Sequence, residues 1–225
     1  MITLKRATPE AVRYACLNFH YAKSVPAVQY AFNVYEGGQW CGCIVYSSGA
    51  NNHIACPFGL GQGEVIELVR VALNGKQTAT SECVAASLRA LHKAAPQIKI
   101  VVSYADTDEG HTGIIYQATN WIYVGMGEPI QKIIINGKKT HFKSISSKYG
   151  FVNLKWIQEH VDPNAKLFVP GGKHKYLFIF DKKLRKQWQA KALPYPKKPC
   201  VSSSTAEQPA ILREGGGSTP TLTLQ

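Results

Sequence analysis

Three features that define other protein classes are missing from this sequence of 225 residues. No apolar run approaches the ~20 residues that a membrane-spanning helix needs, and the mean hydropathy of -0.14 excludes a membrane-embedded chain. The N-terminal residues MITLKRATPEAVR become polar within five positions, so we expect no secretory signal. The six cysteines form no C-x-x-C pair and no histidine-rich zinc spacing; we expect reduced thiols in a cytoplasmic protein, several of them in the core.

Acidic residues are scarce in the second half of the chain. Residues 1–125 carry 9 Lys and Arg against 8 Asp and Glu, whereas residues 126–225 carry 17 against 6. Nearly all of the net charge of +12 therefore lies in the second half, where aromatic residues are interspersed with the lysines: Phe142, Phe151, Trp156, Tyr176, Trp188 and Tyr195. A one-sided basic field beside aromatics is typical of proteins that bind a polyanion, above all nucleic acid. A solvated lysine-rich surface is the plainer alternative.

Strand and helix patterns alternate in residues 1–135. The patterns predict strands at 2–7, 30–35, 40–46, 65–73, 98–104 and 130–135, and helices at 9–20, 80–94 and 111–121. Thr8 and Pro9 supply an N-cap and a first helical residue, and Glu-Gly-Gly-Gln supplies a hairpin turn at 36–39. The order β-α-β-β-β-α-β-α-β is that of the acyl-CoA N-acyltransferase (GNAT) fold. This α/β fold has a mixed sheet flanked by helices, with a ligand groove where two parallel strands splay apart.

We expect three parts along the chain. Residues 1–135 form a GNAT-like catalytic core, and residues 136–199 form a basic, aromatic-containing C-terminal extension for contact with nucleic acid. Within the extension, a hairpin is predicted to end at Phe180, and a helix capped by Asp181 is predicted at 181–192. Residues 200–225, rich in Ser, Thr and Gly with a GGGS run, are expected to be a disordered tail.

The loop before the helix at Thr80 occupies the place where GNAT enzymes bind a pyrophosphate. A helix N-terminus there can receive an anion through its free N–H groups, and Lys76 and Ser81 are the candidate cofactor contacts. However, the loop sequence NGKQTATS holds one glycine, lacks the Q/R-x-x-G-x-G/A pattern, and is followed by the negative charge of Glu82. Coenzyme A binding in the usual manner is therefore not expected.

The segment 103–125, SYADTDEGHTGIIYQATNWIYVG, concentrates chemistry beside a strand end. Asp106, His111 and Tyr116 place a carboxylate, an imidazole and a phenol within eleven residues. Sites of α/β proteins usually lie at the ends of strands. This segment is therefore the leading candidate site.

Several long motifs of this chain resemble the bacteriophage Mom DNA-modification family. They are FHYAKSVP (19–26), GANNHIACPFGL (49–60), EVIELVRVAL (64–73) and the segment 103–125, extended by KHKYLFIF (173–180) and YPKK (195–198). The resemblance implies an enzyme that converts adenine in double-stranded DNA to N6-carbamoylmethyladenine, which protects phage DNA from restriction enzymes. It also implies a GNAT-like fold, bound iron and a place in the host bacterial cytoplasm.

The functional residues that the resemblance implies are His20, Tyr21, Arg70, Ser81, Asp106 and Tyr116. The product joins N6 to a methylene, whereas acyl transfer from a thioester would join it to a carbonyl carbon. A redox metal is one way to activate such a carbon, and phenolate, carboxylate and imidazole ligands suit iron. We therefore predict an iron site drawn from His20, Tyr21, Asp106 and Tyr116. The donor, acetyl-CoA or another small molecule, stays open.

Each of these residues also has a plainer interpretation. His20 can be an ordinary histidine at a helix end, and Tyr21 and Tyr116 can be core tyrosines. Arg70, in the middle of an apolar strand, either points into a cleft as an anion clamp or pairs with an acid. Asp106 can cap the turn that follows it. His111 is left without an assigned role.

An enzyme that reaches N6 in a duplex must flip the adenine out of the base stack. The loop 47–63 is the candidate flipping element, and the candidate phosphate contacts are lysines: Lys138, Lys139, Lys143, Lys148, Lys173 and Lys175. A homodimer acting on the duplex is left open. Two alternatives remain: a coenzyme A-dependent N-acyltransferase, and a non-catalytic DNA-binding protein on a GNAT scaffold.

Overall fold

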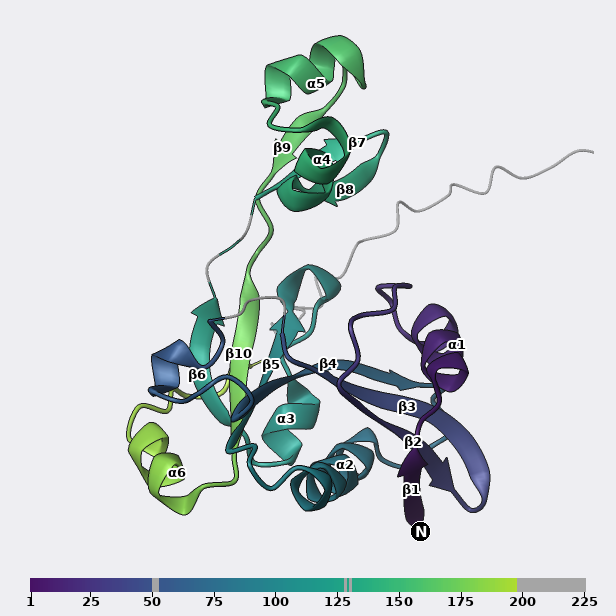
Figure 1. Cartoon of the computed structure of the whole chain (residues 1–225), viewed down its shortest axis with the longest axis vertical. Coiled ribbons are helices and arrows are strands. Elements are labelled where there is room, and N and C mark those ends of the chain that lie inside the picture. The colour runs from purple at the N-terminus through teal and green to yellow at the C-terminus, as the bar shows by residue number, and fades with distance from the viewer. Residues whose placement is uncertain (50–52, 128, 130, 198–225) are drawn as a thin grey trace, which may run out of the picture.

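The computed structural model describes residues 1–49, 53–127, 129 and 131–197. Within these residues a seven-stranded sheet with the order β1-β2-β3-β4-β5-β10-β6 forms the centre of the molecule (Figure 1). Its strands are β1 (Ile2–Arg6), β2 (Tyr30–Glu36), β3 (Gln39–Ser47), β4 (Val65–Leu73), β5 (Ile100–Asp106), β6 (Ile122–Gly127) and β10 (Lys173–Ile179). The expected hairpin turn at 36–39 is present, with Gly37 and Gly38 at positive φ.

Helices pack on both faces of this sheet because its strands are apolar on both sides. On one face, α2 (Thr80–Ala94) and α3 (Ile114–Ala118) contribute to the largest core cluster. On the other face, α1 (Pro9–Phe19) packs against β2, β3 and β4, and α6 (Lys182–Gln189) packs against β5, β10 and β6. The predicted caps are confirmed: Thr8 accepts from Ala11 N at 3.3 Å, and Asp181 accepts from Leu184 N at 2.8 Å.

One pair of neighbouring strands in the sheet is parallel, and this pair separates along its length. β4 and β5 are paired from Val65 and Ile100 as far as Leu68 and Ser103, and no pairing is found beyond that point in the described strands. A register shift against β3 leaves Val69 as the extra residue of a β-bulge immediately after the last paired residue. The expected GNAT-like mixed sheet flanked by helices is therefore confirmed.

The helix predicted at 111–121 is much shorter than expected. α3 covers Ile114–Ala118, because Gly113 before it has φ +79° and Asn120 after it has φ +60°, both in the left-handed region. A short 3₁₀ turn at Thr107–Glu109 precedes it, and Ile122–Gly127 forms the strand β6, for which no element was predicted.

The division expected between residues 135 and 136 does not follow the sheets. The strand predicted at 130–135 was assigned to the GNAT-like core. In the structure, β7 (Lys132–Ile135) instead belongs to a second sheet with β8 (Lys138–His141) and β9 (Lys166–Phe168). The main sheet is completed by β10, which pairs antiparallel with both β5 and β6 and is not part of a hairpin. Strand partners so distant in the chain leave no local signal in the sequence.

Residues 132–168 are called the inserted module below. The module contains β7, β8, α4 (Phe142–Tyr149), α5 (Leu154–His160) and β9, and its own core is built on Ile133, Ile145, Ile157 and Ala165. Figure 1 shows it standing apart from the main sheet, at the end of β6 and the beginning of β10.

Several other expectations concern the rest of the chain. Five cysteines lie in the described residues; all are free thiols, and four of them are buried, as expected. Cys200 and the predicted disordered tail at 200–225 lie outside the described residues. Within the described ranges, no helix has the length and apolar character needed to cross a membrane.

Candidate functional site

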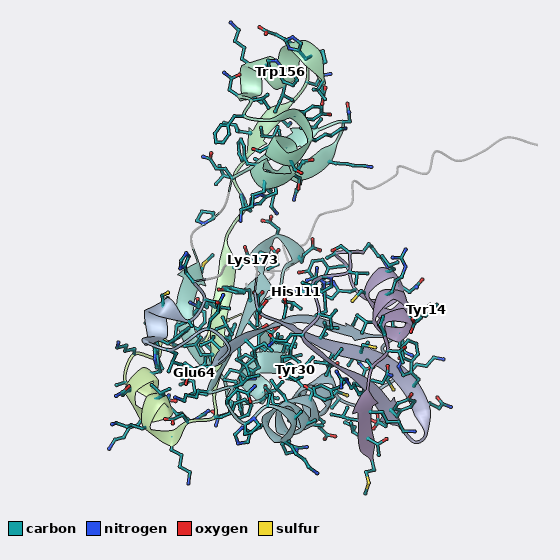
Figure 2. All side chains as sticks on the ribbon, viewed as in Figure 1. Tyr14, Tyr30, Glu64, His111, Trp156 and Lys173 are labelled. Atoms are coloured by element: carbon teal, nitrogen blue, oxygen red, sulfur yellow. The ribbon has the colours of Figure 1, made fainter. Side chains whose placement is uncertain are left out.

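A cavity of about 370 Å³ opens where β4 and β5 separate. Its walls come from the end of α1, from β4, from β5 and from the segment that leads into α3. The lining residues are Phe19, His20, Tyr21, Leu68, Val69, Arg70, Val71, Thr80, Tyr104, Ala105 and residues 110–116. The exposed His111 marks the solvent side of the cavity and is labelled in Figure 2.

Tyr116 forms the buried inner wall of the cavity. The hydroxyl of Ser103 lies 2.8 Å from the Tyr116 hydroxyl and 2.8 Å from the carbonyl oxygen of Leu68, at the point where the two strands part. Ser103 has one hydrogen, so it can donate to only one of these oxygens at a time. A neutral Tyr116 can donate to Ser103 while Ser103 donates to Leu68. Burial raises the pKa of Tyr116 to about 12, so the phenol is neutral at pH 7.

Arg70 follows the β-bulge at Val69 and faces the cavity from β4. Its Nη1 donates to the carbonyl oxygen of Val69 at 2.7 Å, and its Nη2 donates to Ser24 Oγ at 3.1 Å. Its Nε is buried and has no hydrogen-bond partner among the described residues. A buried N–H donor without a partner costs about 1–3 kcal/mol, so a ligand that accepts from Arg70 would relieve this cost. The cleft-facing interpretation of Arg70 is therefore favoured.

His20 and Tyr21 lie directly after α1, which ends at Phe19. The backbone of His20 is extended, and its Nδ1 accepts from Ala22 N at 3.1 Å, which places the proton of a neutral ring on Nε2. Burial, followed by the charges of Arg70 and His111, lowers the pKa of His20 to about 4. His20 is therefore a neutral hydrogen-bond donor at pH 7.

Aromatic rings form a row along this side of the cavity. The rings of His20 and Tyr21 stack at 4.3 Å, and Tyr21 meets His111 edge-on at 5.3 Å. Burial raises the pKa of Tyr21 although the side chain is half exposed. Such a row of flat faces can accept a planar ligand by stacking.

Asp106 is not among the residues that line the cavity. Its Oδ1 accepts from Asp108 N at 3.1 Å, and its Oδ2 lies 3.1 Å from Lys173 Nζ. It thus caps the 3₁₀ turn at Thr107–Glu109, as the plainer interpretation predicted.

Ser81 and Lys76 also lie outside the cavity lining, although their neighbour Thr80 is part of it. The loop before α2 already holds a carboxylate, because Thr78 N donates to Glu36 Oε2 at 2.7 Å. An acidic side chain at this position competes with the phosphates of a coenzyme for the same N–H group.

Comparison with known proteins identifies the family. Residues 1–197 match the sequence model of the Mom protein family. The chain belongs to the Mom protein family. A search among curated proteins gives no match.

Solved structures with a similar fold include several acetyltransferases. An acetyltransferase from Bacillus subtilis in complex with CoA has 10% identity and a TM-score of 0.45, over 80% of this chain and 98% of that one. The spermidine/spermine N-acetyltransferase SpeG from Vibrio cholerae has 11% identity and a TM-score of 0.44, over 83% and 99%. The AHL synthase LasI has 13% identity and a TM-score of 0.42, over 88% and 98%. At these values the likeness carries no information on substrate.

The Mom resemblance implies iron, but the cavity lining includes only three of the four predicted ligands. His20, Tyr21 and Tyr116 line the cavity, whereas the carboxylate of Asp106 is held outside it by Lys173. The cavity also contains the positive charge of Arg70, which disfavours a second cation. Among the described residues, no three His, Cys, Asp or Glu side chains are grouped so that they could hold a metal ion. The residues as arranged do not fit the ion.

Sequence reasoning missed two contributors to this cavity. Ser103 is the polar contact of Tyr116 and is fully buried. A lone serine in the apolar strand IVVSYAD is a signal that could have found it. Thr80 reaches the cavity where the neighbouring Ser81 was expected. No sequence signal distinguishes the two, because both lie in the first turn of α2.

Proposed function

We propose that this Mom family member is a DNA-modifying transferase that converts adenine in double-stranded DNA to N6-carbamoylmethyladenine. The observation that carries the proposal is the family match over residues 1–197, together with one cavity that gathers four of the six residues implied by the family motifs. These four are His20, Tyr21, Arg70 and Tyr116.

The shape and lining of the cavity suit a flipped base. A base taken out of the duplex is held by stacking on aromatic side chains and by hydrogen bonds to its edge. Phe19, Tyr21 and Tyr116 supply aromatic walls, and the cavity of about 370 Å³ is open to solvent beside the exposed His111. Unpairing and extruding the base costs a few kcal/mol of free energy. Stacking of the base on these aromatic walls offsets this cost.

The polar groups of the cavity are hydrogen-bond donors. The neutral His20 offers Nε2–H, and Arg70 offers an unpartnered Nε–H with a fixed positive charge. The neutral phenol of Tyr116 can donate inward or to Ser103. Such groups hold acceptors, namely carbonyl oxygens and the ring nitrogens of adenine.

The proposed reaction forms a bond between N6 and the methylene carbon of the donor, while the bond from that carbon to its leaving group breaks. The proton that N6 loses is carried away with the leaving group. Negative charge grows on the leaving group as it departs. Arg70 is placed to stabilise this charge, because a guanidinium in a partly buried cavity interacts more strongly than one in water. Tyr116 and His20 orient the reacting groups without changing their own charge near pH 7.

The second candidate is a coenzyme A-dependent N-acyltransferase. The separated parallel strands favour it, since this is the groove in which the fold class binds its ligand. The loop before α2 disfavours this candidate. Its Thr78 N–H already donates to Glu36, and the loop carries a single glycine, Gly75. Acetyl-CoA binding with an acylated product would support this candidate.

The test is mass spectrometry of nucleosides from plasmid DNA in cells that express the chain. We expect a deoxyadenosine that carries the added carbamoylmethyl mass, and its strong reduction in an Arg70→Leu variant. Lys93→Gln, on the exposed side of α2, is the control that keeps the modification. If well-folded wild-type protein leaves all deoxyadenosine unmodified, the proposal is wrong.

A further inference from the structure

The inserted module is a small folding unit with a strong positive charge. Residues 132–168 hold seven lysines against Glu159 and Asp162, and the module has its own sheet and its own core. Six of the lysines are exposed: Lys138, Lys139, Lys143, Lys148, Lys155 and Lys166. In the described part of the chain, two of these six have a carboxylate within 4.0 Å, namely Lys139 and Lys155. The remaining charges are available to a polyanion.

A turn between the two helices of the module presents an aromatic side chain to solvent. Phe151 is fully exposed, at 105% of the reference value. A single exposed apolar residue is common on protein surfaces and has no meaning by itself. Phe151 differs from an ordinary exposed residue because hydrogen bonds hold its turn on both sides. Gly150 N donates to Ser146 O at 3.0 Å, and Asn153 caps α5 by accepting from Trp156 N at 2.8 Å.

Aromatic and basic groups alternate around this turn. Lys148 lies 4.8 Å from the ring centre of Tyr149, Tyr149 packs on Trp156 at 5.8 Å, and Trp156 stacks on His160 at 4.6 Å. Lysines beside aromatic faces are the combination that nucleic acid-binding surfaces use, with lysines on phosphates and aromatics on bases. An acidic protein partner would match the lysines and leave the exposed phenyl ring unexplained.

The chain that leads from the module into β10 is hydrogen-bonded to the segment before the cavity wall. Thr107 Oγ1 donates to Gly172 O at 2.8 Å, and Gly171 N donates to Asp108 Oδ1 at 3.0 Å. Lys173, at the start of β10, pairs with Asp106. Figure 2 shows Lys173 between Trp156 of the module and His111 at the cavity. A duplex bound by the module would therefore lie near the turn that precedes the cavity wall.

We propose that the inserted module is the DNA-holding element of this protein, with Lys143 and Lys148 on phosphates and Phe151 inserted into the base stack. Apolar wedges of this kind unstack a base step and kink the duplex by about 20–90°. A kinked, partly unstacked duplex is easier to open at a neighbouring adenine. The inference rests on the proposed function in one respect, that duplex DNA is the substrate.

The experiment uses the full-length protein with the Tyr116→Phe substitution, so that binding is measured without modification. Affinity for a short duplex is measured over a range of salt concentrations, and bending is measured by energy transfer between dyes on the duplex ends. We expect Lys143→Gln combined with Lys148→Gln to reduce the slope of log affinity against log salt by about 0.9 per lysine. We expect Phe151→Ala to weaken binding about tenfold or more and to abolish the bend, with the salt slope unchanged.

Two further variants sharpen the result. Phe151→Leu keeps an apolar wedge and should retain much of the bend, whereas Lys93→Gln lies on α2 and should change neither slope nor bend. Because Phe151 is fully exposed, thermal unfolding of its variants should match that of the parent protein. Binding, slope and bend that match the parent in the Phe151 and lysine variants would overturn the inference. So would equal affinity for a duplex RNA of the same sequence.

Failure of this inference is distinguishable from failure of the proposed function. If DNA is bound and bent as expected but no modified deoxyadenosine is found with wild-type protein, the module assignment holds and the proposed reaction is wrong. If adenine is modified at the same rate in Phe151→Ala and in the double lysine variant, with unchanged binding, the reaction holds and the module assignment is wrong.

Discussion

Replacement of Tyr116 by phenylalanine separates a catalytic role from a structural one. The substitution removes a single hydroxyl and keeps the ring, which packs on Trp121 at 5.0 Å and on Tyr176 at 5.1 Å. Ser103 keeps its contact with the Leu68 carbonyl at 2.8 Å, so no buried hydroxyl is left without a partner. The structural cost is therefore that of one neutral hydrogen bond, about 1 kcal/mol. For a protein of this size that lowers the Tm by about 2–4 °C.

The expected effect on catalysis is much larger. Loss of a preorganised donor from an active site lowers the rate by about 100- to 1,000-fold. We therefore expect the initial rate of modified deoxyadenosine formation, measured by mass spectrometry, to fall at least 100-fold in Tyr116→Phe. The small loss of Tm cannot account for such a decrease.

The chain contains a matched control for this substitution. The Tyr46 hydroxyl lies 2.7 Å from Ser87 Oγ, and Ser87 in turn donates to the Val84 carbonyl at 2.8 Å, also in a fully buried site. Tyr46 and Ser87 thus repeat the tyrosine–serine–carbonyl contacts of Tyr116, but neither residue lines the cavity. Tyr46→Phe should have a similar Tm change and wild-type activity. If both variants keep wild-type activity, Tyr116 is a core tyrosine and the reasoning is refuted.

Three further predictions concern other residues that the Mom resemblance implies. Arg70→Lys keeps the charge but loses the planar Nε and Nη donors, so initial rates should fall about tenfold or more, and equal rates would contradict the assigned role. The pKa of His20 falls from 6.5 to about 4 on folding, so the unfolded chain binds more protons and stability should decrease as the pH falls from 6.5 towards 4. His20→Gln should lessen this decrease in Tm, and an identical pH dependence would contradict it. Asp106 is held outside the cavity, so elemental analysis should find the same iron content in wild-type protein and in Asp106→Asn; iron lost only in the variant would contradict the arrangement described.

Much of the main sheet could be predicted because its elements carry local signals. Thr8 and Pro9 mark the start of α1, and the glycine pair of the hairpin marks the turn between β2 and β3. The short α3 could not be predicted, because its limits depend on left-handed backbone at Gly113 and Asn120 inside a segment with a helical pattern. The place of β10 depends on pairing with strands far away in the sequence.

Part of the site could be predicted from local sequence signals, and the rest depends on residues that are distant in the sequence. His20 and Tyr21 follow a helix end that the sequence marks, and Tyr116 stands on α3. The position of Asp106 depends on Lys173, which is remote in sequence and becomes a neighbour only when β10 pairs with β5. The cavity itself exists because β4 and β5 stop pairing after Leu68 and Ser103, a tertiary feature without a sequence pattern.

The topology joins the basic half of the chain to the cavity in one fold. β10 supplies Tyr176, Leu177 and Ile179 to the core on both faces of the sheet, and its first residue contacts the turn before the cavity wall. A cut at residue 135 would leave β5 and β6 without the strand between them, so the N-terminal part could not keep its fold alone. The inserted module, by contrast, has its own core and meets the main sheet where β6 ends and β10 begins. An insertion at this position adds a charged surface beside the cavity while leaving the sheet that forms the cavity unchanged. The basic excess of the second half is therefore divided between the inserted module, with seven lysines against two acids, and residues 169–199, which include β10 and α6, with nine Lys and Arg against one acid.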